Sequence, residues 1–131
     1  MTVTLAHIWR HPVKSHGREE LPEVTLQAGQ TMPWDRTWAV AHDGARIDGS
    51  EWAPCANFSR GSKAPQLMAI NCELDEVTEQ VTLSHPDCET VTLHPERDAA
   101  RLVEWTRPLM PEDRAQSARV VRVEGRGMTD T

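Results

Sequence analysis

The sequence predicts a mainly β, barrel-like single domain, with a mixed or antiparallel sheet and one covering helix. The chain has 131 residues, a length that suits one domain with one hydrophobic core. Short runs rich in β-branched residues recur about every 8–12 residues, a spacing typical of antiparallel sheets and barrels. Only one segment has clear helical periodicity. We therefore assign residues 1–131 to one domain.

The first predicted strand is TVTLAHIWR, residues 2–10. Its side chains alternate, and both faces carry enough apolar residues for us to expect that they are covered. One face holds Val3, Leu5, His7 and Trp9. The second predicted strand is EVTLQ, residues 23–27, and the AGQ that follows it predicts a turn.

The third predicted strand is RTWAVAH, residues 36–42, with Trp38 and Val40 directed inward. Asp43–Gly44 predicts a tight turn after it. Four more strands are predicted: QLMAINCEL (66–74), EVTEQVTLSH (76–85), TVTLH (90–94) and ARVVRVEG (118–125).

The predicted helix is PERDAARLVEWTRPL, residues 95–109. Pro95 suits the first helical turn, and Pro108 ends the helix. An apolar stripe at helical spacing can cover the sheet, and it consists of Ala99, Leu102, Val103 and Thr106.

The segment of residues 45–66 has little periodicity. A structureless stretch of this length in a compact domain is usually functional or hides short elements. Two interpretations are open: a surface excursion pinned by Trp52 and Phe58, or a ligand-facing loop that uses Arg46, Arg60 and Lys63.

The formal net charge of -6 argues against a nucleic-acid or anionic-membrane binder, because both need a basic face. No apolar run approaches the roughly 18 residues that span a bilayer, and the first residues lack the basic start of a signal peptide. We expect a cytoplasmic monomer.

Three cysteines, Cys55, Cys72 and Cys88, form no CxxC pair, so we expect reduced thiols that are buried or lie in loops. HPDC brings His85 close to Cys88. A metal pair and a plain turn are both open there, and the turn is favoured because no second ligand pair completes a zinc set. No GxSxG or GxGxxG motif supports nucleophilic or nucleotide chemistry.

Three motifs occur in order: PVKS at residues 12–15, LPEVTL at 21–26 and DRTWAVAHDG at 35–44. This series resembles the N-terminal β-barrel domain of MOSC proteins, the molybdenum cofactor sulfurase C-terminal family and relatives such as the amidoxime-reducing enzymes. The family patterns are YPVKSxxG and DRxWMLVDxxG. His11 stands where the family usually has Tyr, and ARIDGSEWAPCANF replaces an arginine-bearing segment, so Arg46 and Arg60 are only candidate stand-ins.

The resemblance implies the molybdenum cofactor (molybdopterin), a pterin with a phosphate group and a dithiolene-bound metal, and a cofactor site that includes Lys14, Ser15 and Arg36. Lysine supplies a mobile charge, serine a hydroxyl donor and arginine a fork suited to phosphate. The alternative is that Lys14 is solvated and that Arg36 pairs locally with Asp35.

The resemblance further implies a substrate- or cofactor-positioning domain that works with a MOSC C-terminal domain in cis or in trans. Residues 119–131 are the candidate start of such a following domain. The family's metal-site cysteine belongs to that domain, so we expect no catalysis and no retained cofactor in this chain alone. A stand-alone binding module that keeps only the barrel scaffold is the competing hypothesis, and a small hydrolase is a third.

Overall fold

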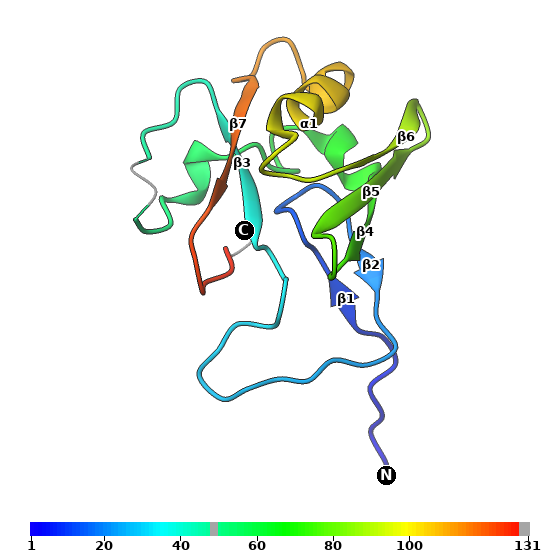
Figure 1. The fold of residues 1–131 in the computed structure, drawn as a ribbon. Coiled ribbons are helices and arrows are strands. Elements are labelled where there is room, and N and C mark those ends of the chain that lie inside the picture. Colours follow the sequence, from blue (N-terminus) through cyan, green and yellow to red (C-terminus); the bar gives the residue numbers. More distant parts are fainter. Residues whose placement is uncertain (48–49, 129–131) are drawn as a thin grey trace.

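The computed structural model describes residues 1–47 and 50–128, and it confirms a mainly β fold with one α-helix (Figure 1). The strands are β1 (Trp9–Arg10), β2 (Glu19–Glu20), β3 (Trp38–His42), β4 (Asn71–Asp75), β5 (Gln80–His85), β6 (Cys88–Leu93) and β7 (Ser117–Arg122). The helices are α1 (Ala99–Thr106) and three 3-10 turns, η1 (Cys55–Asn57), η2 (Pro65–Ala69) and η3 (Arg107–Leu109). Within the described ranges, no helix has the length and apolar character that a membrane crossing requires.

The strands form three antiparallel ladders, β1–β2, β3–β7 and β4–β5–β6. Two parallel bridges join them: Val13 pairs with Trp38, and Arg18 pairs with Asn71. Through these bridges, the three ladders lie side by side, and the strand order across them is β7, β3, β1, β2, β4, β5, β6. Helix α1 packs against both β6 and β7, so it covers the space between the two outer strands (Figure 1).

Strand β3 is buried on both faces. Trp38 and Val40 lie in the main core with the inward residues of β4, β5, β6 and α1, as the sequence predicted. Ala39 and Ala41 face the other way, into a smaller cluster built on Phe58. The predicted turn at Asp43–Gly44 is present, since Ala45 N donates to His42 O at 3.1 Å.

The covering helix is confirmed, with Leu102, Val103 and Thr106 buried as the stripe predicted. It begins at Ala99, later than the predicted residue 95. The residues before it form a hydrogen-bonded turn, in which Asp98 Oδ2 accepts from His94 N at 2.9 Å and His94 Nδ1 accepts from Glu96 N at 3.1 Å. These side-chain bonds hold residues 94–98 as a local turn that precedes the regular helix.

The two N-terminal strand predictions are wrong in most of their length. Only Trp9–Arg10 of residues 2–10 is a strand, and residues 23–27 are not a strand. Val3, Leu5 and Leu26 are 90%, 74% and 65% exposed, so the faces that we expected to be covered are open. A strand needs a neighbour for its backbone groups, and beyond the Leu21 N to Ile8 O bond the described chain supplies none there.

The prediction of one strand over residues 66–74 is half right. Residues 71–75 form β4, but η2 occupies Pro65–Ala69. Pro65 sits in its first turn, where a missing N–H costs nothing. The turn buries Leu67 and exposes Met68.

In the segment of residues 45–66, Trp52 and Phe58 meet edge to face at 5.8 Å, and Trp52 Nε1 donates to Arg126 O at 2.9 Å. Phe58 is only 2% exposed. These contacts show that Trp52 and Phe58 pin the segment, and they leave the ligand-facing role of its cations untested. Residues 48 and 49 lie outside the described residues.

Trp38 is tied to the end of β7 through Glu96. Trp38 Nε1 donates to Glu96 Oε1 at 2.8 Å, and Arg122 Nη1 donates to the same oxygen at 3.2 Å. The Arg122 guanidinium also lies 5.7 Å from the Trp38 ring centroid. Burial raises the pKa of Glu96, but the hydrogen bonds from Trp38 and Arg122 outweigh it and hold the pKa below its ordinary value of 4.5.

A carboxylate whose pKa is depressed in the folded state stabilises the fold above its unfolded pKa, and this stability is lost as the pH falls through the folded pKa. We expect Glu96→Gln to lower the free energy of unfolding at pH 7 by about 0.5–1 kcal/mol, since the carboxylate is partly exposed. The loss should be smaller at pH 3 than at pH 7, because the wild-type carboxyl takes up a proton as the pH falls through its folded pKa. Urea denaturation of wild type and Glu96→Gln at pH 7 and at pH 3 measures this difference in unfolding free energy.

The matched control is Glu112→Gln, a change at an exposed glutamate with no ion pair within the described residues. It should leave the pH dependence of stability unchanged. An equal pH dependence in wild type and Glu96→Gln would show that the Trp38–Glu96–Arg122 contacts do not act as described.

Candidate functional site

The segment of residues 11–14 lies directly beside the start of β3. Arg36 N donates to His11 O at 2.6 Å, Trp38 N donates to Pro12 O at 3.2 Å, and Lys14 N donates to Trp38 O at 2.8 Å. This parallel pairing brings the PVKS and DRxW motifs together, although more than twenty residues separate Lys14 from Arg36 in the sequence.

A tight turn follows Val13. His16 N donates to Val13 O at 3.1 Å, and Ser15, at the third position of this turn, has φ of 63°. His16 is fully buried, and its Nδ1 donates to Lys14 O at 2.7 Å. The turn therefore holds Ser15 in a left-handed conformation that a non-glycine residue adopts only when its surroundings enforce it.

Gly17 completes the turn at φ of 93° and packs against the residue that precedes β4. A Cβ atom at this position would lie 2.4 Å from the carbonyl oxygen of Ile70. Real Cβ atoms do not approach backbone oxygens so closely. The glycine of the KSHG sequence is therefore required by both its backbone angle and its packing.

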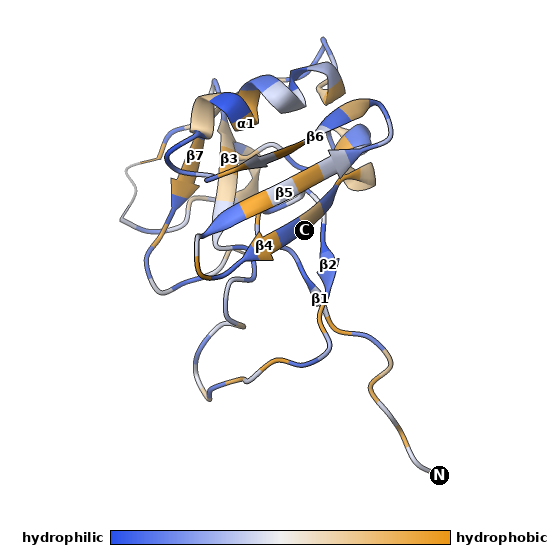
Figure 2. Ribbon diagram, turned by 45° about the vertical axis from the view of Figure 1, so that its right-hand side comes forward, coloured by the Kyte–Doolittle hydropathy of each residue, from blue (hydrophilic) through white to orange (hydrophobic). Residues whose placement is uncertain are grey.

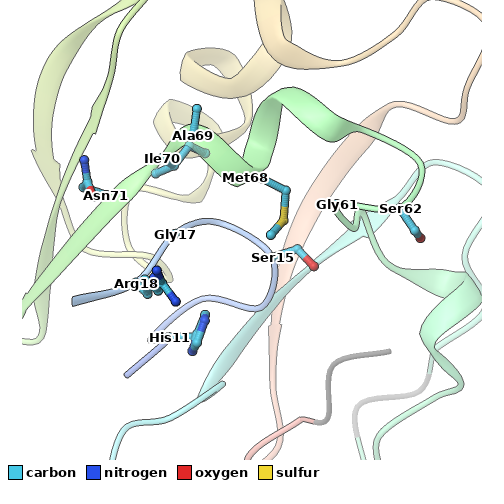
Figure 3. A pocket seen from close by; sticks show the side chains of 10 residues that line it. All are labelled: His11, Ser15, Gly17, Arg18, Gly61, Ser62, Met68, Ala69, Ile70 and Asn71. Carbon is cyan, nitrogen blue, oxygen red and sulfur yellow. The ribbon is translucent and has the colours of Figure 1, made fainter. Parts of the chain in front are cut away.

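A cavity of about 630 Å³ lies between this turn and the segment of residues 61–71 (Figure 3). Its volume falls in the roughly 300–1,000 Å³ range of small-molecule sites. Its lining consists of His11, Ser15, Gly17, Arg18, Gly61, Ser62, Met68, Ala69, Ile70 and Asn71. These ten residues include a cationic side chain and two hydroxyls but no carboxylate, so the cavity suits an anionic or neutral ligand.

The three residues predicted from the sequence occupy different environments. Ser15 lines the cavity. Lys14 is fully buried, so the solvated alternative is wrong for it, and its side chain is not part of the lining. Arg36 forms an ion pair with Asp35, its side chain is 26% exposed, and it too lies outside the lining.

Sequence reasoning did not assign Arg18 or His11 to a site, yet both line the cavity. The Arg18 guanidinium lies 4.0 Å from the ring centroid of Trp9, a cation–π contact that orients it. The signal was present, because Arg18 directly follows the glycine of the turn. Nothing in the sequence indicated that residues 61–71 would line the same cavity as Arg18.

The cysteines and the HPDC motif contribute no metal site within the described residues. Burial raises the pKa of the fully buried Cys72 thiol and, to a smaller extent, that of Cys88. His85 is engaged on both ring nitrogens: Nε2 donates to Gln66 O at 3.0 Å, and Nδ1 accepts from Asp87 N at 3.0 Å. His85 therefore holds the β5–β6 turn, as the favoured interpretation predicted.

The family model of the MOSC N-terminal beta barrel domain matches residues 2–124 of the chain. The chain belongs to this family. No curated protein and no solved structure matches it. In this MOSC N-terminal domain, PVKS and DRxW both lie inside the matched range, and so does β7, which pairs with β3 up to Arg122. The MOSC family is associated with the molybdenum cofactor.

Gly17→Ala tests the packing of the turn, with Gly29→Ala as its matched control. Both glycines have positive φ, but a Cβ at Gly29 would meet nothing within 4 Å. We expect the control to cost about 1–2 kcal/mol of unfolding free energy from backbone strain alone. Gly17→Ala should cost about 1–3 kcal/mol more, because the Ile70 backbone must move. Equal losses in chemical denaturation would contradict the close approach.

Proposed function

We propose that this MOSC N-terminal domain holds the anionic end of the molybdenum cofactor in the cavity beside the PVKS turn. In this proposal the domain positions the cofactor for a MOSC domain in cis or in trans and has no catalytic activity of its own. The observation that carries the proposal is the cavity lining, which combines Ser15 and Arg18 with no carboxylate in a chain of net charge -6.

The residues present fit a phosphate-bearing pterin. The Arg18 guanidinium can donate two parallel hydrogen bonds to a phosphate, and the Ser15 hydroxyl can donate a third. His11 and Met68 supply flat and apolar surface on opposite sides of the cavity (Figure 3). When bound, the cofactor supplies the redox chemistry of its metal, while these side chains only bind and orient it.

In the proposal, Lys14 and Arg36 attract the ligand through their charges without contacting it. Neither lines the cavity, but their backbones are joined through residues 11–14 and 36–38. Lys14 places a positive charge next to the turn that carries Ser15, and Arg36 adds a second charge that its ion pair with Asp35 partly offsets. In the low dielectric of the interior, such charges attract an anion more strongly than they do in water.

The test is binding of the oxidised, fluorescent pterin phosphate derived from the cofactor, followed by fluorescence anisotropy. We expect Ser15→Ala to weaken binding about threefold to tenfold and Arg18→Ala about tenfold to a hundredfold, from the usual contributions of neutral and charged hydrogen bonds. Arg97→Ala removes an exposed arginine outside the cavity and should change nothing.

The dephosphorylated pterin separates recognition of the phosphate from stacking of the ring, and it should bind wild type about as weakly as Arg18→Ala binds the phosphate. Lys14→Met and Arg36→Gln keep much of each side-chain volume, and weaker binding by both supports the longer-range roles. If wild type binds the phosphorylated and dephosphorylated pterins alike, the cavity is not a phosphate site.

The exposed N-terminal segments support the proposed partner. Val3, Leu5 and Leu26 lie in segments with strand-like alternation, and all three are more than half exposed. Both segments extend away from the body of the domain, with orange apolar stretches along them (Figure 2). An apolar edge of this kind can gain strand partners from a second domain, and we assign that place to the MOSC domain.

Hydrogen exchange tests the docking surface. In the chain alone, amides of residues 2–7 and 23–28 should exchange fast, because they make few backbone hydrogen bonds. A family MOSC domain added in trans should slow exchange there at least tenfold. Val3→Asp with Leu5→Asp should abolish this protection. Unchanged exchange at a saturating concentration of the MOSC domain would exclude these segments as its docking surface.

The same proposal places the domain in the cytoplasm, where thiols stay reduced. Its support is that none of the three cysteines, Cys55, Cys72 and Cys88, forms a disulfide.

A further inference from the structure

A second cavity, of about 190 Å³, lies where the C-terminal end of β3 meets the loop that leads into β7. Three cationic side chains line it: Arg60 and Lys63, from the turn that precedes η2, and Arg114, from the loop before β7. Phe58 contributes apolar surface, and Ser59 contributes a hydroxyl. The turn of residues 60–64 also supplies Gly61 and Ser62 to the first cavity, so one turn borders both.

The three cations have no carboxylate partner in the part of the chain that the structure describes. No acidic residue is among the ten described residues that line the cavity. Other cations are paired with acids, as in the Arg10–Glu19 and Arg107–Glu104 contacts, although single exposed arginines such as Arg97 and Arg119 also lack an ion pair within the described residues. Acids outnumber cations by 20 to 14 in the chain, so a cavity lined by three cations and no acid departs from its average composition.

His42 also lines this cavity, and both of its ring nitrogens are hydrogen-bonded within the chain. Its Nε2 donates to Ala56 O at 2.6 Å, and its Nδ1 accepts from Gly44 N at 3.0 Å. A ring with one donating and one accepting nitrogen carries no charge. The positive charge at the cavity is therefore that of Arg60, Lys63 and Arg114.

The volume limits what these cations can bind. A cavity of about 190 Å³ has room for only about six waters at ~30 Å³ each, and it is smaller than the roughly 300 Å³ at which small-molecule pockets begin. A pterin therefore does not fit, but a tetrahedral oxyanion does. Two guanidinium groups and an ammonium match the charge and hydrogen-bonding geometry of phosphate.

We propose that this cavity is a binding site for a phosphate-sized oxyanion, recognised by Arg60, Lys63 and Arg114. It is separate from the proposed cofactor cavity and does not depend on it. The anion offsets the repulsion among three like charges, and it links the segment of residues 45–66 to the loop before β7. Binding of the anion should therefore stabilise the fold increasingly as the phosphate concentration rises above the Kd.

The test is a titration of the ¹⁵N-labelled chain with inorganic phosphate, against sodium chloride at matched ionic strength. We expect saturable shifts of the amide signals of Arg60, Lys63, Arg114 and Ala115. Lys63→Ala with Arg114→Ala should raise the apparent Kd at least tenfold. The matched control is Arg97→Ala with Arg119→Ala, which removes the same charge from two exposed arginines that do not line the cavity, and it should leave the Kd within twofold.

Ser15→Ala with Arg18→Ala separates the two cavities. It should leave the phosphate response of residues 60, 63, 114 and 115 unchanged, whatever it does to pterin binding. Glycerol 3-phosphate in place of phosphate tells whether the site takes a free ion or the end group of a larger molecule. Shifts that do not saturate, or an equal Kd in the Lys63/Arg114 double variant and the control, would overturn the proposal.

Discussion

The rest of the structure depends on the parallel backbone pairing of residues 11–14 with residues 36–38. It is short, yet it joins the β1–β2 ladder to the β3–β7 ladder and places Trp38 at the centre of the main core. Trp38 also donates a hydrogen bond to Glu96, which lies just before α1. This bond connects the helix that covers the two outer strands to the main core. PVKS and DRxW supply the two sides of this junction. Their residues therefore have a structural role in the fold, apart from any role in ligand binding.

A second junction fixes the far side of the proposed cofactor cavity. Gly17 packs on the Ile70 carbonyl, and Arg18 bridges to Asn71. Just beyond, the nearly buried Arg10 donates to Glu19 at 3.1 Å, and the same carboxylate accepts from Leu74 N at 3.2 Å. A buried ion pair of this kind is costly to break from one side, so β1, β2 and β4 are held in one arrangement. One side of the cavity is thereby held in place by contacts outside its lining, which suits a site that positions a ligand.

Backbone strain gathers at the same place. Ser15 and Arg36 both have positive φ, and each is held by hydrogen bonds on either side. Met128 N donates to Arg36 O at 2.8 Å, and a Cβ at Gly127 would lie 2.4 Å from the Asp35 carbonyl oxygen, so the C-terminal segment closes over the DR pair. Strained non-glycine residues persist only where the surrounding contacts hold the backbone in place, and here those contacts are the hydrogen bonds of the junction.

The sequence by itself determined the class of fold, the hairpin of β5 and β6, the apolar stripe of α1 and the inward face of β3, because each follows from the spacing of residues within one element. It also identified the family, through two motifs with fixed residues. It failed at residues 2–8 and 23–27, where alternation was correct for a strand but no neighbour was available. Only the tertiary structure decided that Lys14 is buried, that Arg36 pairs with Asp35 and that Arg18 shares a cavity with residues 61–71. The Arg36–Asp35 pair is local, but the sequence left it open as one of two alternatives. The place of Arg18 depends on contact between segments more than forty residues apart, and no local pattern encodes which side of a turn will meet a distant chain.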